Sequence, residues 1–200
     1  TSATTGKPKG VVYSHRAIVL HCFALGLADT TAISEKDIAL PVVPMFHVNA
    51  WGLPFAATWF GTTQVMPGPQ FTPQIIAQLI QDEKVTITAG VPTIWMALLN
   101  ELEKGNYNTS SLRGVLCGGS AAPKVIIEAF EKKYNIPFLH AYGMTETTPL
   151  VTISTVKSYQ DGELTEGERY DLRAKQGLLV PGLEMKVVGA SGEVEWNDTD

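Results

Sequence analysis

Apolar side chains recur at helical spacing in several segments of the chain and form continuous runs in others. A spacing of three to four residues places side chains on one face of a helix, whereas short apolar or β-branched runs are typical of buried strands. The helical pattern and its capping residues predict helices over 15–28, from 49 to about 60, from 72–73 onwards, from about 94 to 104, and over 124–134. The runs predict strands over 11–14, 38–43, 62–66, 85–89, 112–117 and 137–141.

Strands and helices alternate through most of this pattern. Such alternation predicts an α/β fold with a largely parallel sheet and helices on both of its faces. The polar segment 154–175 predicts a loop, and the runs 183–188 and 193–196 predict a hairpin. We therefore divide the chain into an α/β portion over 1–176 and the start of a β-rich subdomain over 177–200.

Ligands of parallel sheets bind at the carboxyl ends of the strands. Four segments with unusual composition each follow a predicted strand, namely 44–52, 90–93, 118–123 and 140–147. We expect them to gather at one edge of the sheet, close to the first ten residues of the chain.

The composition narrows the classes of function. The chain has 200 residues, of which 44% are hydrophobic and 18% charged, so it is globular. Its net charge of −5 argues against a nucleic-acid partner. No apolar run reaches the roughly 18 residues that span a bilayer, and no signal peptide is evident, so we expect a cytoplasmic protein. Cys22 and Cys117 lie far apart in apolar surroundings, which predicts reduced core residues and no zinc site.

The first ten residues, Thr1-Ser2-Ala3-Thr4-Thr5-Gly6-Lys7-Pro8-Lys9-Gly10, combine hydroxyl groups, glycines and lysines. Hydroxyls and backbone N–H groups can cradle phosphate oxygens, and lysine adds positive charge. The segment is not a Walker A loop, because Gly6-Lys7 is followed by Pro8. The alternative interpretation is a polar surface loop.

A second candidate is Tyr142-Gly143-Met144-Thr145-Glu146-Thr147, which follows a predicted strand. The aromatic ring can stack on a base, the hydroxyl can bind phosphate, and the carboxylate can hold a magnesium ion that bridges phosphates. The alternative is a helix start, in which Glu146 is stabilised by the helix dipole.

In this order the two segments resemble the motifs of the AMP-forming, adenylate-forming enzymes, which include acyl-CoA synthetases, luciferases and peptide-synthetase adenylation domains. The family patterns are Thr-Ser-Gly-Thr-Thr-Gly-x-Pro-Lys-Gly and Tyr-Gly-x-Thr-Glu, and the chain departs from the first only at Ala3. The resemblance spans nearly all of the chain and is greatest to medium- and long-chain fatty acid–CoA ligases. It implies an internal fragment of the large N-terminal domain of such an enzyme.

The resemblance also implies the residues of a nucleotide site. Gly118-Gly119-Ser120 resembles the loop on the adenine side, and Thr1 and Glu146 are implied to hold Mg²⁺. The implied ATP-binding residues are Thr1, Ser2, Thr4, Thr5, Gly6, Lys9, Gly118, Gly119, Ser120, His140, Ala141, Tyr142, Gly143 and Thr145.

The segment 44–52 resembles the acyl site of the family. The resemblance places His47 beside the adenylate and Trp51 at the mouth of the acyl tunnel. The implied acyl-binding residues are His47, Val48, Trp51, Gly90, Val91 and Pro92, and the implied catalytic residues are His47, Thr145 and Glu146. The alternative is that His47 and Trp51, four residues apart, share a buried helix face. We assign His15 and His21 to structural roles.

The reaction implied by the resemblance has two steps. A fatty acid carboxylate attacks the α-phosphate of MgATP, and CoA then displaces AMP to form a thioester. The ribose-binding Asp, the adenylation Lys and the CoA site of the family fall beyond residue 200, so we expect residues 1–200 alone not to make acyl-CoA. The alternatives are an aryl- or aminoacyl-adenylating domain and a non-catalytic nucleotide- or acyl-binding module. A homodimer and peripheral contact with a membrane stay open.

Overall fold

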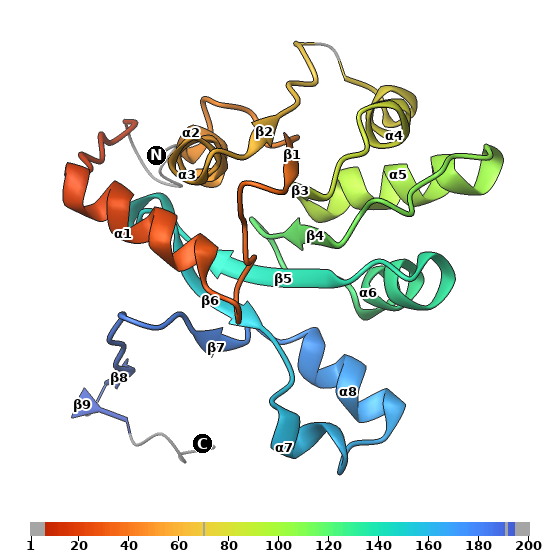
Figure 1. Cartoon of the computed structure of the whole chain (residues 1–200). Coiled ribbons are helices and arrows are strands. Elements are labelled where there is room, and N and C mark those ends of the chain that lie inside the picture. Colours follow the sequence, from red (N-terminus) through yellow and green to blue (C-terminus); the bar gives the residue numbers. More distant parts are fainter. Residues whose placement is uncertain (1–6, 70, 191, 195–200) are drawn as a thin grey trace.

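A computed structural model describes residues 7–69, 71–190 and 192–194 of the chain, and Figure 1 shows its elements. The strands are β1 (Ile38–Pro41), β2 (Thr63–Gln64), β3 (Ile87–Gly90), β4 (Gly114–Cys117), β5 (Phe138–Gly143), β6 (Leu150–Ser154), β7 (Leu178–Leu179), β8 (Val188–Gly189) and β9 (Gly192–Glu193). The helices are α1 (His15–Gly26), α2 (Val48–Trp51), α3 (Leu53–Phe60), α4 (Pro73–Asp82), α5 (Pro92–Lys104), α6 (Lys124–Glu128), the π-helix η1 (Ala129–Lys133), the 3₁₀ helix η2 (Thr145–Thr147), α7 (Ser158–Asp161) and α8 (Glu166–Arg173).

Within the described residues, seven strands form one sheet in the order β2-β1-β3-β4-β5-β6-β7. The first five strands in this order are parallel, and β6 and β7 are antiparallel to their neighbours. The predicted α/β fold with a largely parallel sheet is confirmed. The predicted hairpin is present as β8 paired with β9, although each of these strands is only two residues long. The predicted domain boundary at 176 stays a prediction.

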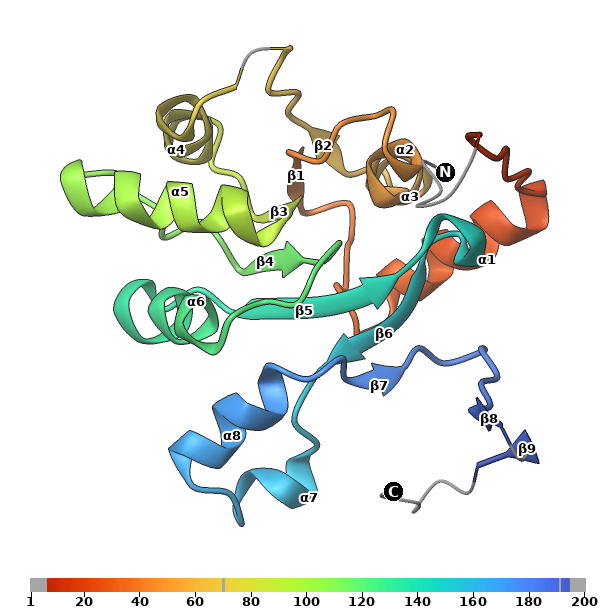
Figure 2. The same ribbon diagram turned by 180° about the vertical axis from the view of Figure 1, so that it is seen from behind.

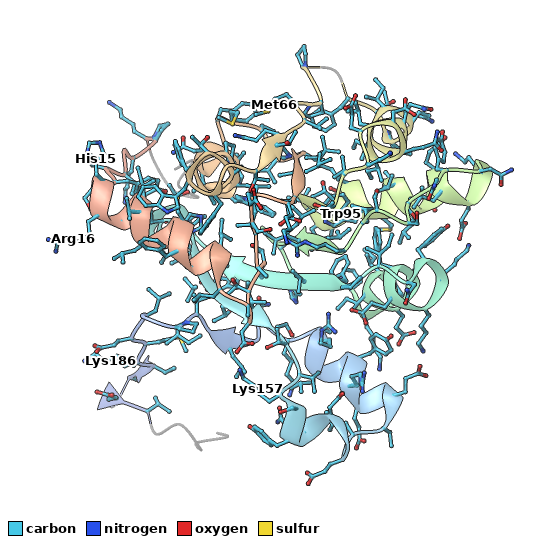
Figure 3. All side chains as sticks on the ribbon, in the orientation of Figure 1. His15, Arg16, Met66, Trp95, Lys157 and Lys186 are labelled. Carbon is cyan, nitrogen blue, oxygen red and sulfur yellow. The ribbon has the colours of Figure 1, made fainter. Side chains whose placement is uncertain are left out.

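Helices cover both faces of the sheet, as Figures 1 and 2 show from opposite sides. Helices α1 and α3 pack on one face around Cys22, Leu25 and Leu53. Helices α4, α5, α6 and α8 cover the other face around a larger core, in which Trp95 (Figure 3) and Phe130 are fully buried. Both cysteines are buried and free, as predicted.

Local sequence explains where two of these helices begin. The Ser14 hydroxyl accepts a hydrogen bond from the Ala17 N–H at the start of α1, and Thr72 caps α4 in the same way, with Pro73 at its first position. Among the described residues, no helix is both long and apolar enough to cross a membrane.

Five of the predicted elements are wrong in whole or in part. Residues 11–14 form no strand, and β1 and β2 are shorter than predicted. The expected helix from Asn49 is divided at Gly52 into α2 and α3. The predicted helix over 124–134 is α6 followed by the π-helix η1.

The prediction of a loop over 154–175 is also wrong, because the segment contains α7 and α8. Helix α8 begins with a capping box, in which Thr165 and Glu168 satisfy each other's backbone N–H groups. It packs beside α6, where the ammonium of Lys124 lies 2.6 Å from the carboxylate of Asp171. The antiparallel strands β6 and β7 were not predicted either.

At the amino-terminal ends of β1, β3 and β4, three side chains form what we call the amino-terminal clamp: Asp37, Thr86 and Arg113. The Asp37 carboxylate accepts hydrogen bonds from the Thr86 hydroxyl at 2.7 Å and from Arg113 Nε at 2.6 Å and Nη2 at 2.8 Å. Arg113 also donates to the carbonyls of Thr31 and Ala32. Burial alone would raise the pKa of Asp37, but hydrogen bonds from Arg113, Thr86 and Ser34 outweigh it and lower the pKa to about 2.

Candidate functional site

A cavity of about 490 Å³ opens where β4 and β5 end, next to α1 and α2. Figure 2 shows the turn between β5 and β6 beside α1, in the region that this cavity borders. The predicted gathering is confirmed for segments 44–52, 118–123 and 140–147, whereas no residue of the segment 90–93 lines this cavity. The described residues that line the cavity are His21, Leu25, His47, Val48, Trp51, Leu116, Gly118, Gly119, Ala141, Tyr142, Gly143, Met144, Thr145, Glu146, Pro149 and Leu150.

The loop after β4 is built from two glycines because the chain comes close to its neighbours there. Gly119 has a φ of +79°, and a Cβ at this position would lie 3.2 Å from the side chain of Val91 and 3.5 Å from that of Trp51. A Cβ at Gly118 would lie 3.0 Å from the carbonyl oxygen of Ala141. The indole of Trp51 therefore packs directly on the backbone of this loop, and Val91 contacts the loop without lining the cavity.

The turn after β5 carries the second predicted motif. Tyr142 borders the cavity and is 41% exposed. A Cβ at Gly143 would overlap the carbonyl of Pro149, so the turn requires glycine here. Thr145 and Glu146 follow on η2, and both border the cavity. The motif thus provides an aromatic ring, a hydroxyl and a carboxylate on one wall.

Helix α2 is a left-handed turn. Val48, Asn49, Ala50 and Trp51 have φ values of +50°, +52°, +53° and +56°, and Gly52 follows at +71°. Each non-glycine residue in this conformation costs roughly 1–2 kcal/mol, and such strain is concentrated at functional sites. The alternative that His47 and Trp51 share a buried helix face is wrong, because His47 is exposed and lies before the left-handed turn.

His21 of α1 holds this turn, in agreement with the structural role predicted for it, although the sequence did not indicate its partner. Its Nε2 lies 2.9 Å from the Trp51 carbonyl oxygen, and because a carbonyl only accepts, Nε2 carries the proton. The ring occupies the space that a Cβ at Gly52 would need. Burial lowers the pKa of His21, although the hydrogen bond to the Trp51 backbone opposes this shift, so the imidazole is neutral at pH 7. His21 also lines the cavity, and no pattern of neighbouring residues marks it.

Several predicted site residues lie outside the cavity lining. His140 is buried, and its Nε2 accepts a hydrogen bond from the Ala122 N–H at 3.3 Å. Burial lowers its pKa, while nearby backbone groups oppose the shift. Ser120 is exposed, and Gly90 and Pro92 are buried behind the cavity wall. The roles of these residues stay predictions.

The predicted phosphate segment lies mostly outside the described residues. This applies to Thr1, Ser2, Thr4, Thr5 and Gly6. Lys9 is described and exposed. The described chain continues from Gly10 to Tyr13, whose hydroxyl donates a hydrogen bond to the Thr145 carbonyl. The stretch that follows the first motif therefore contacts the second motif directly.

The chemistry of the lining fits a nucleotide and a magnesium ion. Mg²⁺ is bound in enzymes by one or two carboxylates together with substrate phosphates, and Glu146 is the carboxylate of the described lining. Within the described residues, no group of three or more His, Cys, Asp or Glu could hold a metal by itself. Glu146 could hold such an ion only together with other ligands, among which phosphate oxygens would be suitable.

Comparison with known proteins agrees with this geometry. Residues 1–198 match the family described as AMP-binding enzyme. The chain is 50% identical over 192 residues to a long-chain-fatty-acid–CoA ligase from Thermus thermophilus, and 43% identical over 192 residues to a medium-chain-fatty-acid–CoA ligase from Ectopseudomonas oleovorans. Each match covers 96% of this chain and 35% of the relative, so the chain spans about a third of the length of these proteins.

The fold is similar to that of o-succinylbenzoate coenzyme A synthetase from Bacillus subtilis in complex with ATP and magnesium ion. The TM-score is 0.79 at 27% sequence identity, and the match covers 99% of this chain and 38% of that protein.

Proposed function

The chain belongs to the AMP-binding enzyme family, and from this premise we propose that it forms the nucleotide- and acyl-binding part of an AMP-forming fatty acid–CoA ligase. The proposed substrates are ATP, CoA and a medium- or long-chain fatty acid. The relatives named above carry out reactions of this class, and about two thirds of their length has no counterpart in this chain.

The proposal rests on the residues that line one cavity. Its wall at 142–146 offers the aromatic ring, hydroxyl and carboxylate that suit a magnesium-bound nucleotide, and the same cavity is bordered by the apolar side chains of Leu25, Leu116 and Leu150. A polar part for the nucleotide and an apolar part for an acyl chain in one space would bring a carboxylate to an α-phosphate.

In the proposed first step, a carboxylate oxygen of the fatty acid attacks the α-phosphorus of ATP, and pyrophosphate leaves. Backbone N–H groups of the glycine loop and the ring of Tyr142 would orient the nucleotide, while Trp51 would separate it from the acyl chain. Mg²⁺ would reduce the negative charge on the phosphates, with Glu146 and Thr1 holding it. The contribution of these residues is positioning and electrostatic stabilisation, which accounts for most of phosphoryl-transfer catalysis.

In the proposed second step, the thiol sulfur of CoA attacks the acyl carbonyl of the adenylate. The thioester forms and AMP leaves with the bonding electrons. His47 is exposed at the cavity wall, where it would lie beside the adenylate.

The lining favours an aliphatic acid over an amino acid. Among the described residues that border the cavity, Glu146 is the one carboxylate and there is no Lys or Arg, and Glu146 belongs to the nucleotide motif. A site for an amino acid would need a carboxylate near the substrate ammonium group, and the apolar wall of Leu25, Leu116 and Leu150 provides none.

Acid-dependent exchange of labelled pyrophosphate into ATP tests the proposal. The protein is produced from the complete reading frame that contains this sequence, and the panel holds short, medium and long fatty acids, benzoate and amino acids. We expect exchange that requires both Mg²⁺ and a medium or long fatty acid. Exchange only with benzoate or only with amino acids would show that the substrate is an aryl acid or an amino acid, respectively. MgATP binding without exchange for any acid would instead favour a non-catalytic binding module.

A further inference from the structure

Tyr13 joins two parts of the candidate site that are far apart in the sequence. It lies three residues after Gly10 and immediately before Ser14, the residue that caps α1. Its hydroxyl donates a hydrogen bond of 2.5 Å to the backbone carbonyl of Thr145, 132 residues along the chain. The bond therefore links the end of the first motif to the turn that carries Glu146.

The side chain of Tyr13 is half-buried where this hydrogen bond forms. It borders a space of about 10 Å³ together with Ile18 of α1, Asn49 of the left-handed turn and the segment 148–149. Tyr13 therefore lies where α1, α2 and the end of the turn after β5 come together.

Within the turn, the hydrogen bond to the Thr145 carbonyl is long, whereas two other backbone hydrogen bonds have ordinary lengths. The Met144 N–H donates to the Pro149 carbonyl at 3.0 Å, and the Thr147 N–H donates to the Met144 carbonyl at 3.0 Å. The internal donor to the Thr145 carbonyl is the Thr148 N–H, at a long 3.5 Å. The bond from Tyr13 is therefore the short one that this carbonyl accepts.

Electrostatics keep the Tyr13 hydroxyl a donor. Burial raises the pKa of Tyr13, and the nearby negative charge of Glu146 raises it further. The phenol therefore keeps its proton at neutral pH, and it lies within the electrostatic reach of the carboxylate that faces the cavity.

We propose that Tyr13 is a positioning residue of the adenylation site, whose hydroxyl fixes the Thr145 carbonyl and so orients Thr145 and Glu146 toward the stretch that follows Gly10. The inference rests on the proposed function, because it assumes that both motifs act on one MgATP. Tyr13 touches neither the nucleotide nor the metal in this account. It acts through Thr145, and a displacement of about 1 Å at such a site can lower a rate by about a hundredfold.

The variant Tyr13→Phe tests the inference, because it keeps the ring and removes only the hydroxyl. In the protein from the complete reading frame, we expect the Mg²⁺ concentration for half-maximal exchange to rise about tenfold and the Kd of MgATP, measured by calorimetry, to rise by a similar factor. We also expect faster hydrogen exchange of the backbone amides between 143 and 149. The control is Tyr159→Phe, at a tyrosine that is 74% exposed on α7, which should change none of these values.

A purely structural role predicts a different result. Tyr13→Phe would then lower the melting temperature and leave the Mg²⁺ requirement and the MgATP affinity as in the parent, which would overturn the inference. If the parent protein itself shows no acid-dependent exchange, the proposed function fails. In that case unchanged amide exchange between 143 and 149 in Tyr13→Phe would overturn the positioning contact, and faster exchange would support it.

Discussion

At the amino-terminal ends of β1, β3 and β4, charged and hydroxyl side chains satisfy one another, whereas at the carboxyl-terminal ends the shape depends on glycines and on strained backbone. The amino-terminal clamp unites Asp37, Thr86 and Arg113 through short hydrogen bonds. The opposite edge has the left-handed turn from Val48 to Gly52 and the glycine loop after β4. It also has the turn after β5, whose Thr145 carbonyl accepts a hydrogen bond from Tyr13.

The comparison indicates that one edge of the sheet contributes to stability and the opposite edge forms the candidate site. A buried, paired carboxylate resists separation of the strand ends and so opposes unfolding. Positive φ angles cost stability, and glycines allow close backbone contacts beside a cavity that a ligand can enter. We therefore expect substitutions in the amino-terminal clamp to lower mainly the stability of the fold. Substitutions at the cavity should lower mainly the activity.

The largest effect on stability is expected from Asp37→Asn. The change removes the negative charge that pairs with Arg113 and leaves the guanidinium without its anion. We expect the free energy of unfolding to fall by about 3 kcal/mol, near the low end for a buried pair because the Arg113 side chain is 38% exposed. Urea denaturation followed by tryptophan fluorescence measures it. Asp82→Asn, at an exposed position of α4, is the control and should change the value by less than about 0.5 kcal/mol. An equally small effect of Asp37→Asn would show that the clamp is not a source of stability.

At the cavity edge, Gly52→Ala should mainly affect activity. Its Cβ would overlap the ring of His21, so either the imidazole or the left-handed turn must move. We expect acid-dependent pyrophosphate exchange to fall about a hundredfold. Gly61→Ala is the matched control, because Gly61 has nearly the same φ, +74°, and its Cβ would come no closer than 3.9 Å to Glu35. Equal losses in both variants would attribute the effect to backbone strain and not to His21.

The third effect depends on pH. Since the pKa of Asp37 is about 2 in the folded protein and 3.8 ordinarily, its ionised form stabilises the fold. This contribution of about 2 kcal/mol is complete above about pH 4 and is lost as the pH falls toward about 2. The difference in the free energy of unfolding between the parent and Asp37→Asn should therefore become smaller as the pH falls. Urea midpoints measured from neutral pH down to about pH 3 would reveal it, and a difference that stays constant would contradict the assignment.

Much of the fold can be predicted from the sequence because it depends on neighbouring residues. The alternation of apolar runs and helical spacing predicts the parallel strands, and Ser14 and Thr72 mark helix starts. The glycine loop at 118–119 and the motif at 142–146 follow predicted strands, so their meeting at one edge is predictable as well.

Other features of the fold and the site depend on contacts between residues far apart in the sequence, which no local pattern predicts. Asp37 and Arg113 are 76 residues apart, and Tyr13 and Thr145 are 132 apart. The left-handed turn from Val48 onward contacts His21, which lies 30 residues from Trp51 in the sequence. In contrast, α8 was predictable, because Thr165-Glu166-Gly167-Glu168 is a capping-box pattern.

The turn between β5 and β6 has a consequence for how the sequence can diverge. It sets the register in which Ala141 pairs with Ile153 and Tyr142 with Thr152, and Ile153 packs in the core under α1. Adding or removing one residue between 144 and 149 would turn Ile153 to the other face of the sheet. Descendants of a common ancestor should therefore keep the length of this turn. An alignment of relatives should show gaps near 155–165, outside the sheet, and none between 143 and 150.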